Sequence, residues 1–475
     1  MARPKFVLLP SRPPEAFAPL LGEAGYKRLE VAAAGAREQF EGRAIWHVSS
    51  TLRGGGVAEM LRSLLPYVRG AGVDTRWAVL REDPRFFALT KRLHNNLHGD
   101  RGDGGPLGRA EHSLYEGTLR RSAGHFEGLI HRGDVVFLHD PQTAGLARPL
   151  GAFGATVLWR CHIGVDDPGE TGLRAQRFLA PDVAAADLCV FSRRGLVWPG
   201  LDPARCRVMA PSIDPFSPKN QELDRGAVTA ILRAAGLTAA GGREEAPLFT
   251  RADGSPGRVE RRAEVVQAGP VPEGAKLVAQ VSRWDRLKDP DGLLECLATE
   301  LEGAAELHLL LAGPDSDAVA DDPEGALVWR EVRAHRDALP AAVRARVHLA
   351  GLPMADLDEN GVVVNAIQRR ADVVVQKSLA EGFGLTVAEA MWKRRPVVGS
   401  RVGGIAEQIV DGHSGLLVDP RDPRALARAV LELLGDPDLV ARLGAAAHDR
   451  VRRRYLGAVR LTEYAELLAD LEGRR

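Results

Sequence analysis

Short β-branched runs alternate with longer helical patterns along most of this chain, and this alternation limits the possible folds more than any other feature of the sequence. In the first half, runs typical of buried strands lie at residues 44–48, 75–80, 135–139, 156–160 and 188–191. Helical patterns separate them, as at residues 57–69 and 172–185. Such alternation predicts a parallel sheet with helices on both faces.

The second half of the chain repeats this arrangement, and a helical pattern follows each of its strand-like runs. The runs lie at residues 276–281, 307–312, 347–350, 373–375, 396–399 and 415–418. We therefore expect a second doubly wound sheet. In folds of this kind, ligands bind at the carboxyl ends of the strands.

Residues 209–220 interrupt the alternation with three prolines. Proline stiffens an extended connection, so we interpret this segment as the interdomain linker. The predicted fold class is α/β, with two Rossmann-like, doubly wound domains facing a cleft. The N-terminal domain covers residues 1–215 and the C-terminal domain residues 216–455, while an amphipathic helix in 456–475 packs back on the N-terminal domain. Residues 239–272, rich in Gly, Arg and Glu without periodicity, are expected to form a solvated loop.

Composition narrows the classes of function. The chain has 475 residues and is 45% hydrophobic, enough for two or three well-buried domains. Basic and acidic residues both total 63, so the formal net charge is zero. This balance argues against a nucleic acid or an anionic membrane as the main partner. The N-terminus has only a short apolar run before Pro10, so we expect no signal peptide, no membrane span and a cytoplasmic location.

The sequence offers no recognisable metal centre. Cys161, Cys189, Cys206 and Cys296 lie far apart and form no C-x-x-C pair, so we expect reduced, mostly buried thiols. No H-E-x-x-H motif is present. We predict that no metal or other cofactor is required, and that Mg²⁺ is at most stimulatory.

The stretch from Glu381 to Glu389 places two carboxylates eight residues apart around a glycine-bearing turn. A strand-like run precedes Glu381 and a helical pattern begins at Thr386, so Glu389 lies on the helix that follows. Gly382 and Gly384 allow a ligand to approach the backbone, and the helix N-terminus offers N–H groups to phosphate. One carboxylate at a sugar and another at a ribose, with amides on the diphosphate between them, would form a nucleotide-sugar site.

Two basic residues follow the first strand-like run of the second half. Arg283 supplies a planar fork for phosphate oxygens, and Lys288 adds a mobile point charge in the same loop. Both are expected at the carboxyl end of the sheet, the edge that also carries Glu381. A solvated pair of surface charges is the alternative interpretation.

A glycine-rich segment follows the first strand-like run of the first half and opens a helix. Gly54, Gly55 and Gly56 leave backbone N–H groups for an anionic or polyhydroxyl ligand, and Glu59 lies in the first helical turn. The segment is neither a P-loop nor a dinucleotide fingerprint. A tight turn that needs left-handed backbone conformations is the alternative.

Polar side chains also follow two later strand-like runs of the first half. His139, Asp140 and Gln142 follow one run and His162 follows the next, so all four are expected at the same edge of the sheet. Together they can form hydrogen bonds with several sugar hydroxyls. A structural role is the alternative for each histidine taken alone.

Taken together, these segments resemble the retaining GT-B glycosyltransferases of family four. Within that family, the resemblance is to the trehalose glycosyltransferring synthases and their sister group, the retaining trehalose phosphorylases. It spans most of the chain, and the segments that carry it are residues 54–60, 139–142, 159–163, 211–215, 281–285 and 376–385.

The resemblance implies a role for each motif. Glu381 and His162 would be catalytic residues at the transferred glucose, with His162 beside its anomeric carbon. Arg283 and Lys288 would be catalytic residues on the donor diphosphate, and Glu389 would hold the ribose. The other substrate contacts would come from Gly55, Gly56, Glu59, His139, Asp140, Gln142, Gly382, Phe383, Gly384 and Leu385.

The implied reaction moves glucose from an NDP-glucose to glucose with retention, giving α,α-trehalose. Retaining phosphorolysis of trehalose to glucose 1-phosphate and glucose is the alternative, and a non-catalytic sugar-nucleotide-binding protein is a third hypothesis. The nucleotide base and the physiological direction stay open. The expected partners are NDP-glucose, glucose and trehalose, with no nucleic acid and no membrane, and a homodimer is left open.

Overall fold

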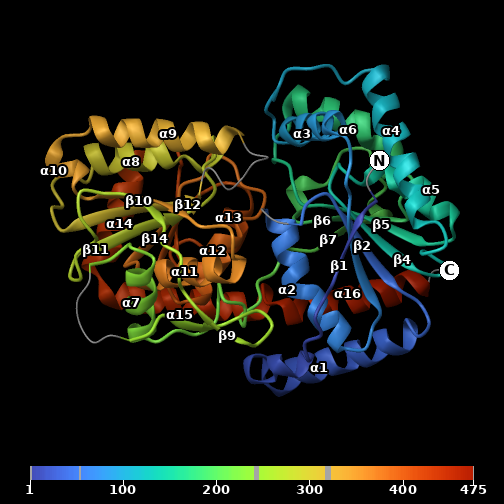
Figure 1. Ribbon diagram of the computed structural model, residues 1–475, viewed down its shortest axis with the longest axis horizontal. Coiled ribbons are helices and arrows are strands. Elements are labelled where there is room, and N and C mark those ends of the chain that lie inside the picture. The colour runs from blue at the N-terminus through green and yellow to red at the C-terminus, as the bar shows by residue number, and fades with distance from the viewer. Residues whose placement is uncertain (1–2, 53–54, 240–244, 316–322, 474–475) are drawn as a thin grey trace. The chain divides into compact units, whose positions relative to one another are not determined.

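The structure is a computed structural model that describes residues 3–52, 55–239, 245–315 and 323–473. The chain divides into two compact units. The first unit combines Met1–Ser212 with Tyr455–Arg475, and the second is Ile213–Arg454. Sequence analysis puts the boundary after residue 215 and assigns the C-terminal helix to the first domain. In the described residues each unit contains one seven-stranded sheet with helices on both faces (Figure 1).

The first sheet has the strand order β1-β3-β2-β4-β5-β6-β7, with β1 antiparallel to β3 and the other pairs parallel. Its strands are β1 (Lys5–Val7), β2 (Ile45–Ser49), β3 (Thr75–Val79), β4 (Val135–His139), β5 (Thr156–Cys161), β6 (Leu188–Phe191) and β7 (Cys206–Val208). The helices are α1 (Ala18–Gln39), α2 (Gly56–Gly70), α3 (Pro84–Leu97), α4 (Arg109–Ala123), α5 (Ala147–Ala152), α6 (Gly169–Val183) and α16 (Gly457–Glu472).

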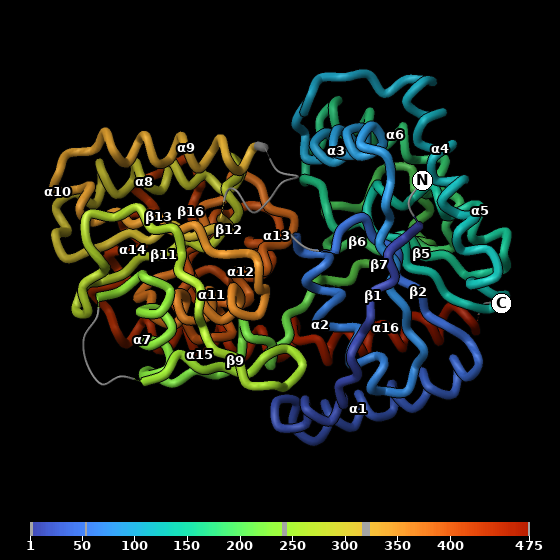
Figure 2. The backbone as a smooth tube through the Cα atoms, viewed as in Figure 1, coloured from blue at the N-terminus to red at the C-terminus, as the bar shows by residue number. Residues whose placement is uncertain are grey.

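Alternate positions of each strand point to opposite faces of this sheet, and the apolar side chains on each face pack against a different set of helices. Trp46, Leu138 and Trp159 pack with α3, α4, α5 and α6 on one face. Ile45 and Leu158 pack on the other face with Leu467 and Leu468 of α16. Figure 2 shows the C-terminal helix, in red, running beneath the sheet beside the blue N-terminal helix α1. Segments from both ends of the chain therefore share one core.

The second sheet has the order β10-β13-β12-β11-β14-β15-β16, with β10 antiparallel to β13 and the other pairs parallel. Its strands are β10 (Glu264–Val266), β11 (Lys276–Val281), β12 (Leu307–Pro314), β13 (Val347–Leu352), β14 (Val373–Gln376), β15 (Val397–Ser400) and β16 (Leu416–Val418). The helices are α7 (Arg225–Ala234), α8 (Pro290–Thr299), α9 (Pro323–Ala338), α10 (Ala341–Arg344), α11 (Leu357–Arg370), α12 (Leu385–Trp392), α13 (Gly403–Gln408), α14 (Pro423–Gly435) and α15 (Pro437–Arg454).

Residues 239–272 were predicted to form a solvated loop. Residues 240–244 lie outside the described part of the chain, and in the rest of the segment the prediction is wrong. Strands β8 (Leu248–Thr250) and β9 (Pro256–Arg258) form a hairpin, and β10 joins the edge of the sheet. Phe249 is only 6% exposed. The buried carboxylate of Glu359 on α11 accepts hydrogen bonds from the backbone of this segment, which orders it despite its weak periodicity.

Each sheet has one point where the strand order reverses. In the first sheet the chain goes from β2 to β3 on one side and later crosses to β4 on the other. In the second sheet the same reversal separates β11 from β14. Ligands of open α/β sheets bind outside the carboxyl ends of the strands at such switch points. The two switch points are therefore where a functional site is expected.

Candidate active site

A single glutamine holds together the two loops at the switch point of the second sheet. Gln280 of β11 is 1% exposed. Its Nε2 donates to the carbonyl of Lys288 (2.8 Å), and its Oε1 accepts from the amide of Lys377 after β14 (2.8 Å). The amide of Leu379 also donates to the carbonyl of Leu287 (2.8 Å). The backbones that carry Lys288 and Glu381 are thus fixed relative to each other.

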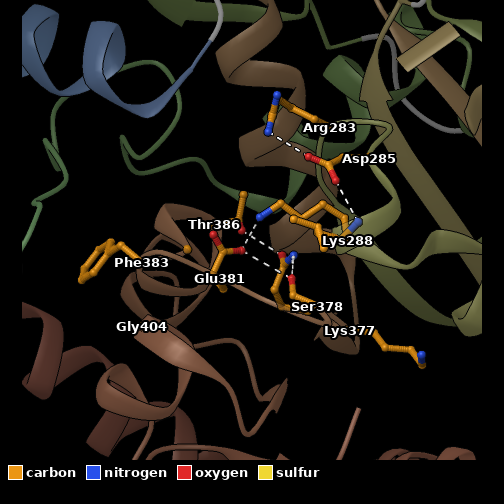
Figure 3. Close-up of polar contacts among 12 residues, drawn as sticks. Arg283, Asp285, Lys288, Lys377, Ser378, Glu381, Phe383, Thr386 and Gly404 are labelled. Carbon is orange, nitrogen blue, oxygen red and sulfur yellow. Dashed lines mark hydrogen bonds and ion pairs between the residues drawn. The ribbon is translucent and has the colours of Figure 1, made fainter. Parts of the chain in front are cut away.

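Lys288 and Glu381 form an ion pair at this point, and Figure 3 shows their charged groups pointing toward one another. Their side chains are 16% and 10% exposed, so the pair is largely but not fully removed from water. Ser378 Oγ lies 3.4 Å from Glu381 Oε2 and donates a second, longer hydrogen bond. A cation and a carboxylate predicted from separate motifs therefore meet in the structure.

Arg283 lies at the open side of the same loop. Its guanidinium donates to Asp285 Oδ2 (2.9 Å), and its side chain remains 48% exposed. Asp285 also accepts from the amide of Leu287 (2.8 Å), so the arginine is attached to a carboxylate that is itself fixed by the backbone. The guanidinium is accessible to an anionic ligand.

The backbone after Glu381 turns sharply into α12. Gly384 has φ +86°, a conformation that favours glycine, and it precedes the first residue of the helix. Gly404 allows α13 to approach this turn, because a Cβ there would lie 2.3 Å from the Cα of Phe383. The side chain of Gln408 donates to the carbonyls of Phe383 and Gly384. The N-terminus of α12, with its positive dipole end, is therefore held at the carboxyl edge of the sheet.

The position of Glu389 differs from the predicted ribose contact. Glu389 is fully buried in α12, and Lys219 Nζ lies 3.3 Å from its Oε1. Lys393, four residues later, donates to Asn220 Oδ1 (2.9 Å) and to the backbone carbonyl of Glu389 (3.1 Å). A ribose could reach Glu389 only if this buried pair were rearranged.

The glycine-rich segment lies at the switch point of the first sheet. Gly55 has φ +120°, is exposed and precedes α2, which begins at Gly56. Glu59 is half-buried in the first turn of that helix. Gly54 lies outside the described residues. The structure thus places Gly55 and Gly56 where a ligand can approach a helix N-terminus, as the sequence predicts for them.

The residues after β4 are under backbone strain. Asp140 has φ +62°, which is uncommon for a residue with a side chain and is found most often at functional sites. Its Oδ1 accepts from the amide of His162 (2.7 Å), and burial raises its pKa to about 7. Gln142 is half-buried, and its Oε1 has no hydrogen-bond partner in the described part of the chain. That oxygen is itself buried, so it is an unsatisfied acceptor beside the site.

Three histidines on neighbouring strands of the first sheet are linked in series. Nδ1 of His47 (β2) lies 3.1 Å from Nε2 of His139 (β4), and Nδ1 of His139 lies 3.1 Å from Nε2 of His162, which follows β5. His139 is 1% exposed. Both its ring nitrogens are engaged, so the predicted contact between His139 and a sugar hydroxyl differs from the structure. His162, which is half-buried, is the member of the set that a ligand can reach.

Sequence analysis missed several polar residues around these sites, chiefly His47, Gln280, and the ion pair of Lys377 with Asp289. His47 and Gln280 lie inside the strand-like runs at residues 44–48 and 276–281. Their position could have been a signal: a polar residue within an apolar run is expected to be buried, and a buried polar group needs a hydrogen-bond partner. Figure 3 shows Lys377 directed away from Glu381.

No group of three or more His, Cys, Asp and Glu side chains in the described residues could hold a metal ion. None of the helices described is long and apolar enough to cross a membrane.

Known proteins match this chain along nearly its whole length. The family model described as trehalose synthase, N-terminal domain, matches residues 47–197, and the model for glycosyl transferases group 1 matches residues 261–450. A trehalose synthase of Pyrococcus horikoshii is 34% identical over 97% of this chain and 96% of its own length. One of Rubrobacter xylanophilus is 34% identical over 92% of both.

Solved structures support the fold. An α,α-trehalose-phosphate synthase (UDP-forming) of Burkholderia vietnamiensis superposes with a TM-score of 0.65 at 17% identity, covering 90% of this chain and 98% of that one. A sucrose-phosphate synthase of Thermosynechococcus elongatus gives 0.61 at 18% identity, covering 91% and 100%. The two doubly wound sheets thus define a GT-B glycosyltransferase. By its identity with the relatives above, the chain belongs to the trehalose synthase family, which confirms the resemblance in its motifs.

Proposed function

We propose that this protein is a retaining glycosyltransferase that moves glucose from an NDP-glucose to the anomeric hydroxyl of glucose, forming α,α-trehalose. The observation that carries the proposal is the Lys288–Glu381 pair at the switch point of the second sheet. Beside it lie the exposed Arg283 and the N-terminus of α12. These groups supply positive charge for a diphosphate and a carboxylate for sugar hydroxyls, which are the two chemistries that a nucleotide sugar requires.

In the proposed reaction, the bond from the anomeric carbon of the donor to its diphosphate oxygen breaks. The acceptor oxygen forms its bond on the same face, and the acceptor proton passes to a phosphate oxygen of the departing diphosphate. No protein side chain needs to act as a base. The task of the protein is then to position both sugars and to stabilise the charge of the leaving group. Arg283 and Lys288 would supply that charge, and Glu381 would accept hydrogen bonds from the transferred glucose.

Phosphorolysis is the second candidate, because trehalose phosphorylases are also relatives of this chain. One from Pleurotus pulmonarius is 25% identical over 85% of this chain, but the match covers only 54% of that protein. The synthases match over more than nine tenths of their length at higher identity. This difference favours synthesis of trehalose over its phosphorolysis.

The proposal is tested by comparing substrates side by side. The purified protein is incubated with glucose and each of ADP-, UDP- and GDP-glucose, with trehalose and inorganic phosphate, and with maltose alone. Products are followed by NMR of the anomeric protons. We expect trehalose and free NDP from at least one nucleotide sugar. Glucose 1-phosphate from trehalose, with no reaction of any NDP-glucose, would establish phosphorolysis instead. Trehalose from maltose alone would show an isomerase.

A further inference from the structure

The three linked histidines of the first unit form a column. The rings lie edge to edge and nearly in one plane: the centroids of His47 and His139 are 5.4 Å apart with planes 22° apart, and those of His139 and His162 are 5.4 Å and 18° apart. Phe137 stacks on His47, with ring centroids 4.8 Å apart. We call His47, His139 and His162 the histidine column. Its members come from consecutive positions in the sheet order β2-β4-β5, so the sheet itself fixes their spacing.

The column is neutral. Burial lowers the pKa of His47 to about 3 and holds the pKa values of His139 and His162 well below the usual range. The buried guanidinium of Arg160 on β5 adds to this effect in all three rings, since it disfavours a second positive charge nearby. Each imidazole therefore carries a single N–H at ordinary pH.

Neutral imidazoles joined in this way cannot choose their tautomers independently. A hydrogen bond between two ring nitrogens needs one N–H and one lone pair, and each neutral ring has one of each. The two bonds of the column join Nδ1 to Nε2 both times. Only two arrangements satisfy both bonds: every ring carries its proton on Nδ1, or every ring carries it on Nε2.

The outer end of the column is the ring nitrogen of His162 that does not contact His139. Nε2 of His162 is occupied by His139, which leaves Nδ1. That atom lies 3.5 Å from the hydroxyl of Ser192, at the limit of a hydrogen bond, and a hydroxyl can either donate or accept. The tautomer of the column therefore decides whether Nδ1 of His162 presents a proton or a lone pair.

We propose that His47, His139 and His162 act as one tautomeric unit, in which His47 and His139 are positioning residues that set the hydrogen-bonding polarity of His162. The hydrogen bond of His162 to a sugar hydroxyl rests on the proposed function, whereas the coupling of the three tautomers does not.

The coupling is tested by NMR of protein labelled with ¹⁵N in its histidine rings, without any substrate. Wild-type His139 and His162 are expected to show the same tautomer. In His47→Phe the ring still stacks on Phe137 but cannot form the hydrogen bond, so the ring nitrogens of His139 and His162 should shift together. His47→Asn, whose amide can donate or accept near the position of Nδ1, should shift them less.

The matched control is His348→Phe in the second unit. His348 is buried and hydrogen-bonded to His308 (2.9 Å), so the substitution removes a comparable pair without touching the column. It should leave the three column signals in place. Opposite tautomers for His139 and His162 in the wild type would overturn the proposal even if His47→Phe failed to fold. So would a His162 signal that does not move in a folded His47→Phe protein.

Activity supplies a separate readout. If His162 meets a sugar hydroxyl, His47→Phe should lower kcat/KM for glucose transfer about five- to tenfold, and His47→Asn should recover part of the loss. Binding of free NDP, proposed for the second unit, should be unchanged in both. If the tautomers are coupled but the protein transfers no glucose, the proposed function is refuted and the tautomer proposal is supported. If the protein transfers glucose normally but the tautomers are not coupled, the tautomer proposal is refuted and the proposed function is supported.

Discussion

Each sheet of this protein has a switch point, but the two differ in chemistry. At the second, charged groups meet near the surface, with Lys288 paired to Glu381 and Arg283 half in water. At the first, neutral histidines are hydrogen-bonded to one another, and the amide of His162 donates to Asp140, whose pKa burial raises to about 7. The same kind of fold thus gives a site of paired charges in one unit and a set of uncharged, hydrogen-bonded histidines in the other.

This contrast fits a division of labour between the two units. Fixed and mobile cations suit a diphosphate, whose charge increases as it leaves. Uncharged donors and acceptors suit sugar hydroxyls, which need direction rather than charge. The predictions below test whether transfer needs the charged side chains at the second switch point and whether the histidines at the first are neutral. They begin with the largest expected effect.

Removing the charge of Glu381 should have the largest effect. Glu381→Gln keeps the shape but loses a charge-assisted hydrogen bond, commonly worth about 1.5–3 kcal/mol and more where the bond strengthens in the transition state. We expect kcat/KM for glucose transfer to fall about 100-fold or more in a protein that still folds, and the melting temperature to fall as well, because Lys288 loses its charged partner.

Glu306→Gln, on an exposed position of the same unit, is the matched control and should behave as the wild type. Near-normal turnover by a well-folded Glu381→Gln protein would remove this carboxylate from the site.

The two cations should act on one group. Arg283→Ala and Lys288→Ala should each weaken NDP binding and slow transfer by about tenfold, since each loses a charged contact. The double variant should lose less than the product of the two, because both residues would serve the same diphosphate. Calorimetric titration with NDP and steady-state kinetics measure the two effects. Unchanged NDP affinity in both single variants would make the loop an ordinary charged surface.

Glu389 tests whether a charge of the second unit serves stability or ligand binding. Breaking a buried ion pair leaves its partner uncompensated and typically costs about 3–5 kcal/mol. Glu389→Gln should therefore lower the melting temperature by on the order of 10 °C, and Lys219→Met in the same chain should restore part of the loss. A variant that melts normally but has a raised KM for NDP-glucose would instead support the ribose contact expected from the sequence.

The sequence predicted the strands whose side chains are apolar on both faces of the sheet. The runs at residues 135–139, 188–191 and 276–281 coincide with β4, β6 and β11 because strands covered by helices on both sides are continuously apolar. The antiparallel edge strands β1 and β10 were missed. Each is three residues long and has no buried residue, so its pairing with a neighbouring strand is what defines it.

The sequence could predict which loops of the candidate site lie together, because these loops follow the ends of parallel strands. Because parallel strands end at one edge, the loops carrying Lys288 and Glu381 could be expected to meet, and they do. The Lys219–Glu389 pair could not be foreseen, since it joins residues far apart in sequence through tertiary packing. The bond between His47 and His139 depends in the same way on the registration of β2 against β4.

The neutrality of the first unit should appear as a pH dependence of stability. The pKa of His47 is about 3 in the folded protein and near 6.5 when unfolded. Between these values the unfolded chain binds a proton that the folded chain does not, so stability falls as the pH is lowered through this window. Phenylalanine cannot bind that proton. From about pH 7 to about pH 5, His47→Phe should therefore lose fewer degrees of melting temperature than the wild type.

Asp140 acts with the opposite sign, because its raised pKa lets the folded chain hold a proton that the unfolded chain releases up to about pH 7. It is present in both proteins, so the difference between their two melting curves isolates His47. Parallel curves for the two proteins would show that His47 titrates normally and that the column is not kept neutral by burial.

The smallest expected effect concerns metal. If Arg283, Lys288 and the helix dipole at α12 together neutralise the diphosphate, the second unit needs no ion to do so. Extensive treatment with EDTA should then leave transfer substantially intact, and added Mg²⁺ should stimulate it modestly at most, through the free nucleotide. Activity that disappears on chelation and returns only with a stoichiometric metal would mean that the charges of this switch point are insufficient alone. The contrast between the charged switch point and the neutral histidines would then have to include a bound metal ion.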